Sequence, residues 1–153
     1  MSKEFKEPIY PEDPSKNTEV VIIPREEIQY FVMESIRNSE MQILATMDLK
    51  EELQKPLSKE YHELVRQKLN NGVKFYKLGF GSKDDFEAMK LRLDISLPNY
   101  VFLHSLDVEK YRRMILVDKK HLFFGQGLVF CTTTNTELIA SFTTYFENVN
   151  PIP

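Results

Sequence analysis

The strongest concentration of chemically capable side chains lies in "KYRRMILVDKKHLFFGQ", the stretch from Lys110 to Gln126. Tyr111, Arg112 and Arg113 come directly before an apolar run that has the character of a buried strand. A guanidinium presents a fixed fork of hydrogen-bond donors and a phenol adds one more, so such side chains can bind an anion together. The alternative is that both arginines are solvated at a strand end, or pair with the acidic residues that precede them.

The expected backbone decides which of these side chains can act together. Side chains alternate across a sheet, so in a strand that runs to Asp118, Tyr111 and Arg113 would point to the same face, one pleat apart. Both faces of this strand are apolar in its middle, which indicates a central strand covered on both sides. Tyr111 and Arg113 are therefore expected to meet at the mouth of this strand.

The rest of the chain supplies the elements that would position this stretch. Apolar alternation or short apolar runs predict strands, and apolar residues at three- and four-residue steps predict helices. The predicted strands cover 20–23, 41–47, 73–80, 99–106, 112–118, 121–125 and 127–132. The predicted helices cover 25–37, 58–70, 82–93 and 134–149, and 48–56 is a polar connection or a short helix. Strands that first alternate with helices and then follow one another predict an α/β fold, with a mixed sheet flanked by helices on both faces.

Capping residues support three of these helices. Ser58 and Ser82 are predicted N-caps, and Thr134 with Glu137 matches the capping box T-x-x-E. Residues 1–18 carry three prolines and alternating charges, which predicts a flexible tail or the remnant of a linker from a larger protein. The following residues, 19–150, are predicted to form one domain.

Composition restricts the classes of protein that fit. The chain has 153 residues and a net charge of −3, so its overall charge does not draw it to DNA or to anionic lipid. The single cysteine, Cys131, excludes a disulfide within the chain and a cysteine-based zinc site. No signal peptide is visible, and no apolar run approaches the roughly 18 residues needed to span a bilayer. We expect a cytoplasmic protein with no metal or cofactor, no membrane association and no DNA contact of its own.

The order of the elements resembles one lobe of the phospholipase D-like superfamily over nearly all of residues 20–149. The segments 24–47 and 61–80 resemble that family's first helix and strand, and its next helix, turn and strand. "YRRMILVDKKHLFFGQ" stands where the family carries its catalytic signature H-x-K-x-x-x-x-D, followed by a strand that ends in glycine and a small residue. The spacing matches, because Asp118 is seven residues after Tyr111 and Gly125 is seven after Asp118.

The departures from the family pattern bear on activity. Tyr111 stands at the family's nucleophilic histidine and Arg113 at its lysine, and only Asp118 is retained. Gln126 replaces the small residue after the glycine, and Leu128 replaces the following asparagine. A tyrosine hydroxyl has a pKa of about 10 and is a poor nucleophile at neutral pH, whereas arginine keeps the positive charge and recognises anions. The resemblance therefore implies a domain that has lost its nucleophile and still binds an anion.

We interpret the chain as a non-catalytic phospholipase D-like domain that binds an anionic or polar ligand, or a partner, and acts in regulation. Tyr111 and Arg113 would contact the ligand, with Gln126 nearby and Asp118 orienting the arginine. The closing amphipathic helix makes the chain similar to the effector domains of TrmB-type transcriptional regulators, which share this fold and lack its catalysis. Residues 135–137 could instead be a remnant of the family's N-x-E element, but the helical spacing that follows favours a helix start.

Two alternative functions stay open. A diverged phosphodiesterase or nuclease would act as a homodimer whose two copies face one pocket, with Tyr111, Asp118 and a recruited histidine such as His104 as catalytic residues. A structural oligomerisation domain would have the ancestral pocket filled by side chains. Homodimerisation also suits the regulatory interpretation, by analogy with the family.

Overall fold

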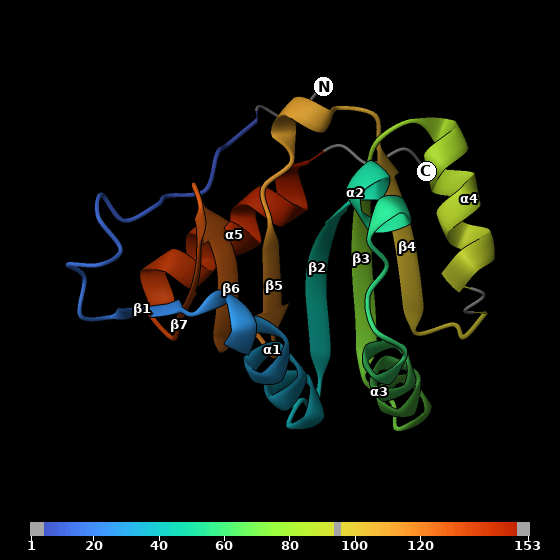
Figure 1. Cartoon of the computed structure of the whole chain (residues 1–153), viewed down its shortest axis with the longest axis horizontal. Coiled ribbons are helices and arrows are strands. Elements are labelled where there is room, and N and C mark those ends of the chain that lie inside the picture. Colours follow the sequence, from blue (N-terminus) through green and yellow to red (C-terminus); the bar gives the residue numbers. More distant parts are fainter. Residues whose placement is uncertain (1–4, 94–95, 150–153) are drawn as a thin grey trace.

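The apolar segments of the chain form seven strands that join in one mixed sheet (Figure 1). The computed structural model describes residues 5–93 and 96–149, so the first four residues of the predicted tail and residue 150 of the predicted domain lie outside the described part. The strands are β1 (Val20–Ile23), β2 (Gln42–Asp48), β3 (Lys74–Phe80), β4 (Tyr100–Ser105), β5 (Met114–Val117), β6 (His121–Gln126) and β7 (Val129–Thr133).

The strand order across the sheet is β1-β7-β6-β5-β2-β3-β4. Strands β2, β3 and β4 are parallel neighbours, while β5 pairs antiparallel with β2 on one side and with β6 on the other. Strand β7 is antiparallel to both β6 and β1. The mixed α/β sheet predicted from the sequence is confirmed, with its crossover units first and its antiparallel strands last.

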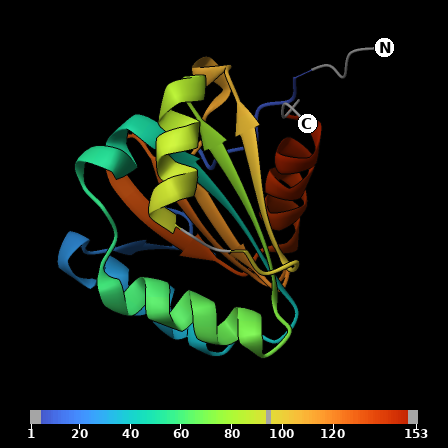
Figure 2. The same ribbon diagram turned by 90° about the vertical axis from the view of Figure 1, so that its right-hand side faces the viewer.

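Helices cover both faces of the sheet, as predicted. They are α1 (Ile28–Arg37), α2 (Leu49–Gln54), α3 (Lys59–Asn70), α4 (Lys83–Leu93) and α5 (Thr136–Asn148), together with the short 3-10 helices η1 (Arg25–Glu27) and η2 (Val108–Lys110). Figure 2 shows α1 and α3 on one side of the sheet and α5 on the other. No helix among the described residues is long and apolar enough to cross a membrane.

Two hydrophobic cores lie on the two sides of the sheet. Alternation along β2 divides its side chains between them: Leu44 belongs to the core under α5, and Ile43 and Ala45 belong to the core under α1 and α3. All three residues are buried, because β2 lies inside the sheet and is covered on both faces. A smaller cluster, with Met47 and Met89 in it, joins α2 and α4 to the α1 face of the sheet.

Side-chain caps start several helices. The hydroxyls of Ser58 and Ser82 accept hydrogen bonds from the N–H three residues on, at 3.2 and 3.1 Å, so both predicted N-caps are confirmed. The predicted cap of α5 at Thr134 is wrong. Asn135 is the N-cap, because its Oδ1 accepts from the N–H of Leu138 at 2.9 Å, which places the helix start one residue later.

A tight turn joins β5 to β6. Asp118 and Lys119 have φ values of 54° and 53°, and the N–H of Lys120 donates to the carbonyl oxygen of Val117 at 3.0 Å. Two consecutive residues in the left-handed backbone conformation match the twist of the strands in a two-residue hairpin. Aspartate adopts that conformation more readily than most other residues. The turn therefore centres on 118–119, one residue before the predicted Lys-Lys connection.

Strand β3 carries a buried lysine, Lys77. Lys77 is only 5% exposed, and its ammonium lies 5.9 Å from the centre of the Tyr61 ring and 5.7 Å from that of Phe75. Burial lowers the pKa of Lys77, and the carboxylate of Glu52 partly opposes that effect. The aromatic faces give the ammonium a favourable electrostatic environment in a place where water is scarce.

Candidate ligand-binding site

The segment that enters β5 is irregular, and buried side chains hold it from two sides. The hydroxyl of Thr46, on β2, donates to the carbonyl oxygen of Arg112 at 2.7 Å and accepts from the N–H of Met114 at 3.0 Å. The hydroxyl of Tyr145, on α5, accepts from the N–H of Arg112 at 2.8 Å and donates to the carbonyl oxygen of Lys110 at 2.7 Å. Residues 110–112 are therefore fixed without being part of the sheet ladder, and the first contact with β6 is the hydrogen bond from the N–H of Gly125 to the carbonyl oxygen of Arg113 at 3.1 Å.

This irregular backbone separates the two side chains that the sequence places on one face. Tyr111 packs against the core under α5, with its ring centre 5.4 Å from that of Phe80. Arg113 lies on the other core, with its guanidinium carbon 4.4 Å from the centre of the Phe130 ring. The expected shared face is wrong, because strand alternation begins only at Met114 and does not extend back to Tyr111.

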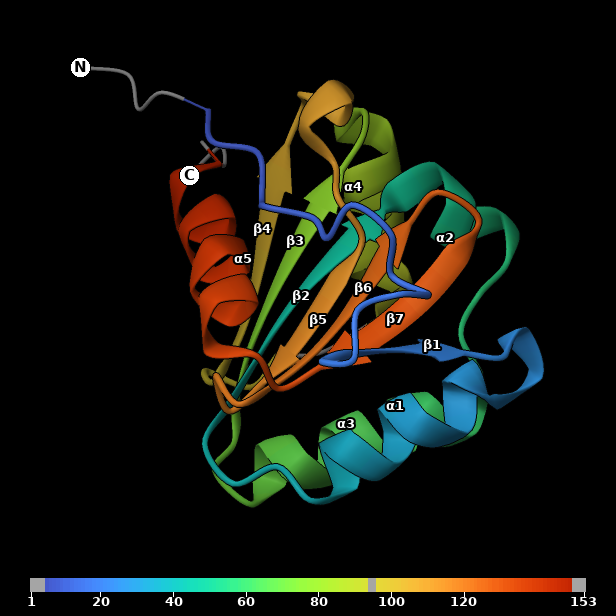
Figure 3. The same ribbon diagram turned by 90° about the vertical axis from the view of Figure 1, so that its left-hand side faces the viewer.

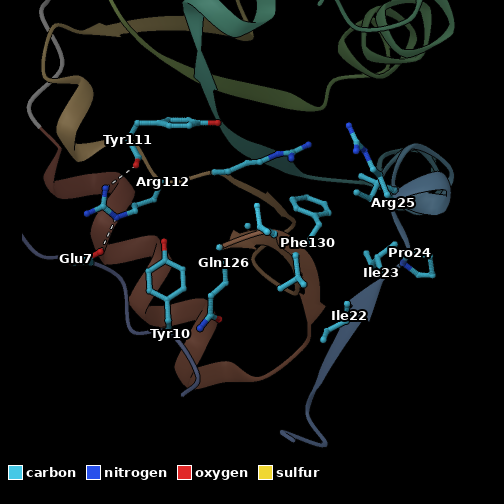
Figure 4. A pocket seen from close by; sticks show the side chains of 16 residues that line it. Glu7, Tyr10, Ile22, Ile23, Pro24, Arg25, Tyr111, Arg112, Gln126 and Phe130 are labelled. Atoms are coloured by element: carbon cyan, nitrogen blue, oxygen red, sulfur yellow. Dashed lines mark hydrogen bonds and ion pairs between the residues drawn. The ribbon is translucent and has the colours of Figure 1, made fainter. Parts of the chain in front are cut away.

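A cavity of about 980 Å³ opens beside this segment (Figure 4). Its wall is built by the N-terminal segment, the end of β1 with the start of α1, residues 111–113 and the β6–β7 hairpin. Tyr111, Arg113 and Gln126 all line it, so the structure brings three of the predicted site residues to one space. Asp118 and His104 do not line it.

Three arginines line the cavity and differ in what they already bind. Nε of Arg112 pairs with the Glu7 carboxylate at 2.8 Å, and its Nη1 donates to the carbonyl oxygens of Glu109 and Tyr111. Arg25 and Arg113 form no ion pair or side-chain hydrogen bond with any residue in the described ranges. Figure 4 shows Arg25 and the Arg112–Glu7 pair on opposite sides of the pocket. The guanidiniums free to meet an anion are thus those of Arg25 and Arg113.

Tyr111 is held in its protonated form. Burial raises the pKa of its hydroxyl; Arg113 opposes this, and the nearby carboxylates of α2 and Asp48 add to it. A phenol with a raised pKa donates a hydrogen bond at neutral pH and is a weaker nucleophile than an ordinary tyrosine. The chemistry available at this position is therefore hydrogen bonding.

Gln126 connects the cavity wall to the N-terminal segment. Its Nε2 donates to the carbonyl oxygen of Pro11 at 2.7 Å, while its Oε1 is buried without a hydrogen-bond partner among the described residues. The preceding Gly125 carries no side chain, and a Cβ built there would lie 3.4 Å from Cβ of Arg113. The stem of Arg113 therefore runs close over the backbone of β6.

Asp118 lies at the other end of β5. Its carboxylate accepts hydrogen bonds from the backbone N–H groups of Glu40, Met41 and Gln42 at 2.8 to 2.9 Å. Burial alone would raise the pKa of Asp118, but these three donors together lower it. Because its oxygens are used there, Asp118 is not placed to orient Arg113.

His104 is buried on β4, away from the cavity wall. Its Nε2 lies 2.8 Å from the carbonyl oxygen of Gly81, and since a carbonyl can only accept, Nε2 carries the proton. Its ring stacks on Phe86 at 4.5 Å. The histidine is therefore used in packing and is not placed to act as a base toward Tyr111. Among the residues that the structure describes, no group of three acidic, histidine or cysteine side chains could hold a metal ion.

Sequence inspection missed four residues that build this site. Nothing in the sequence marks Arg25 or Glu7, because a charge after a proline or in a polar tail carries no periodic signal. Thr46 carries the one hydroxyl in the apolar run "ILATM", which is the only sign in the sequence that this side chain has a buried hydrogen-bond partner. Tyr145 belongs to a helical apolar stripe, so nothing marked its hydroxyl as a partner for the backbone of Arg112.

The fold and the cavity define an α/β domain with a mixed sheet and a cationic pocket at the mouth of its central strand. No family model and no curated protein matches the chain. Among solved structures the fold is similar to that of TrmBL2, an archaeal chromatin protein with a novel mode of DNA binding, at a TM-score of 0.62 and 14% identity. The match covers 89% of this chain and 54% of TrmBL2, so the chain spans about half the length of that protein.

A second solved structure with a similar fold is NucT from Helicobacter pylori. Its TM-score is 0.60 at 11% identity, over 85% of this chain and 92% of NucT. At identities this low, both likenesses show a shared fold alone. They agree with the fold that the sequence resemblance implied.

Proposed function

We propose that the chain is a non-catalytic ligand-binding or regulatory domain whose cavity holds an anionic ligand. The observation that carries the proposal is the pair Arg25 and Arg113, whose guanidiniums line the cavity without an ion pair inside the described part of the chain. A guanidinium that rests on an aromatic ring keeps its in-plane donors directed outward, as Arg113 does on Phe130. Two such cations suit a phosphate or a carboxylate.

The rest of the wall suits the body of an organic anion. Ile23, Pro24 and Phe130 contribute apolar surface to the wall, and Tyr111 adds a protonated hydroxyl. Pockets for small molecules combine such apolar walls with a few placed polar groups. A phosphorylated or carboxylated metabolite would use both.

The alternatives are less well supported. Hydrolysis through Tyr111 would need a lowered pKa and a nearby base, whereas burial raises its pKa and His104 is engaged with Gly81. An oligomerisation domain with a filled pocket does not account for an open cavity of about 980 Å³. All the proposed ligand contacts come from one chain, so the proposal does not require a homodimer.

A regulatory role is in keeping with the likeness to TrmB-type effector domains, and we place the domain in the cytoplasm. TrmBL2 binds DNA, but this chain has a net charge of −3 and the proposal includes no DNA contact.

Thermal unfolding with small ligands tests the proposal. The ligands are inorganic phosphate, glucose 6-phosphate and AMP, with glucose as the uncharged reference. We expect at least one anion to raise the melting temperature of the wild type and of Arg66→Met, and not that of Arg113→Met. Arg66 is exposed on α3 and does not line the cavity, so it gives the same change of charge elsewhere. Equal shifts in all three proteins, or no shift in the wild type, would contradict the proposal.

A further inference from the structure

Residues 5–11 form one side of the cavity, and we call them the N-terminal strap. Figure 3 shows this part of the chain, in blue, beside α5 and the sheet before it enters β1. Glu7 and Tyr10 line the cavity, and the carbonyl of Pro11 holds Gln126 in its wall. The sequence predicts a flexible tail here, but over 5–11 the structure places the chain against the folded unit.

Aromatic contacts hold the strap at both ends. The ring of Phe5 meets that of Tyr145 edge-on at 6.2 Å. The ring of Tyr10 lies 5.4 Å from Phe142 and 6.1 Å from Phe124. Between these anchors the backbone makes few bonds to the protein, among them one from the N–H of Ile9 to the hydroxyl of Ser141. The strap is thus attached by side chains and lacks the ladder of a strand.

The ion pair at the centre of the strap uses only part of Arg112. Glu7 accepts from Nε alone, and Nη2 makes no hydrogen bond with any described residue. The side chains of Arg112 and Glu7 are 25% and 55% exposed, so water reaches the pair and weakens it. A phosphate can take the Nε and Nη2 donors of one guanidinium together, and it carries more charge and more oxygen acceptors than a carboxylate.

Resting on the proposed function, we propose that Glu7 is an internal competitor for the cavity and that a phosphate-bearing ligand displaces the strap by taking Arg112. In the free protein Glu7 neutralises Arg112 and closes that side of the cavity. A ligand held at one end by Arg25 and Arg113 extends a second phosphate across the cavity to Arg112 and replaces the carboxylate. The strap then loses its central contact and loosens between its aromatic anchors. A small monocarboxylate has a single charge and two oxygens, which Arg25 and Arg113 already occupy, so it leaves Arg112 with Glu7 and the strap in place.

Titration calorimetry with pyrophosphate as the probe tests the competition. The proteins are the wild type, Glu7→Gln and Glu12→Gln. Glu12 is exposed in the same segment and does not line the cavity, so it controls for the loss of one negative charge. We expect Glu7→Gln to bind pyrophosphate about twofold to fivefold more tightly than both other proteins, the range expected for an exposed pair.

Hydrogen exchange measured by mass spectrometry on the peptide that contains residues 5–12 separates displacement from a simple effect of charge. We expect saturating pyrophosphate to speed exchange in the wild type, and saturating acetate to leave it unchanged. In the absence of ligand, Glu7→Gln should exchange faster than Glu12→Gln.

Each result supports or overturns the proposal. Equal pyrophosphate affinity in Glu7→Gln and Glu12→Gln, or unchanged exchange on binding, overturns the strap competition and leaves the anion site intact. If neither the wild type nor Glu7→Gln binds pyrophosphate, and no anion of the thermal series binds, the proposed function fails and the competition fails with it.

Discussion

Asp118 and Arg113 lie at opposite ends of β5 and have different roles, since Arg113 lines the cavity and Asp118 does not. The carboxylate of Asp118 receives three backbone N–H groups from the start of β2, while its own N–H donates to the carbonyl oxygen of Gln42 at 2.8 Å. It thereby ties the β5–β6 turn to the strand on the other side of β5. The role we assign to Asp118 is the alignment of strands.

Replacing Asp118 by asparagine should test this role, because asparagine also tolerates a positive φ but lacks the charge and sets an NH2 donor where one carboxylate oxygen accepts from a backbone N–H. We expect Asp118→Asn to lower the free energy of unfolding by about 1–3 kcal/mol at pH 7, measured by urea titration. Asp84→Asn, at an exposed position on α4, should change it by less than about 0.5 kcal/mol.

Acid should remove the difference between the wild type and Asp118→Asn. The folded-state pKa of Asp118 is lowered, so its contribution is present above the unfolded pKa of about 3.9 and is lost as pH falls through the folded value. A difference that stayed constant down to pH 2 would show that the carboxylate charge is not the cause.

At the scale of single residues, the sequence predicts which residues line the site better than it predicts where their side chains point. Tyr111, Arg113 and Gln126 were proposed as site residues, and the structure gathers them at one cavity. The placement of Tyr111 and Arg113 on different faces was not predictable, because the break in alternation depends on Thr46 and Tyr145, which lie more than 30 residues from Arg112 in the chain. Long-range side-chain contacts of this kind leave no periodic trace in a sequence.

At the scale of elements, α5 does more than cover the sheet. The hydroxyl of its buried Tyr145 satisfies one donor and one acceptor of the irregular segment before β5. Since buried backbone groups without partners are costly, this contact is what allows residues 110–112 to leave the ladder. The helix therefore shapes the cavity wall through a residue that does not line it.

Tyr145→Phe removes the hydroxyl and keeps the ring in the core. We expect a loss of about 1–3 kcal/mol in the free energy of unfolding, because the N–H of Arg112 and the carbonyl of Lys110 lose their partner. Tyr30→Phe is the matched control, since Tyr30 is 64% exposed, and it should cost less than about 0.5 kcal/mol. Equal chemical-denaturation midpoints for the two variants would contradict the bracing role of Tyr145.

The elements themselves were largely predictable, and their edges less so. Apolar periodicity located all the strands and the longer helices, because burial on both sides of a sheet leaves a strong pattern. The start of α5 and the turn at 118–119 were each displaced by one residue. Asn135 caps the helix and Asp118 adopts the positive φ of the turn, and neighbouring polar residues could have done either.

At the scale of the whole molecule, one sheet separates two cores, and polar contacts connect the helices to the sheet. His121 on β6 makes one such connection, because its Nδ1 lies 3.1 Å from the hydroxyl of Ser35 on α1 and its Nε2 lies 2.6 Å from that of Thr132 on β7. Thr132 donates to the carbonyl of Leu122 at 3.0 Å, so Nε2–H is the donor to Thr132 and Nδ1 accepts from Ser35.

Mild acid should weaken this connection between layers. Burial lowers the pKa of His121, so the folded protein binds this proton less readily than the unfolded chain. Stability from this group is fully present above the unfolded pKa of about 6.5 and is lost as pH falls toward the folded value. We expect the wild type to lose more unfolding free energy than His121→Gln between pH 7.5 and 5.5, measured by urea titration at both pH values. Equal losses in the two proteins would contradict this.

Lys77 has a consequence for the chain before it folds. It lies within "FYKLGF", an apolar segment in which Phe75, Tyr76 and Phe80 favour strand formation. Uncharged segments of this length and composition pair readily with copies of themselves when a nascent chain exposes them. In water Lys77 is fully charged, since the ordinary pKa of lysine is about 10.4, and like charges then oppose each other in any stack of such segments. We therefore expect the same lysine that is costly to bury in the finished protein to oppose aggregation of the β3 segment during synthesis.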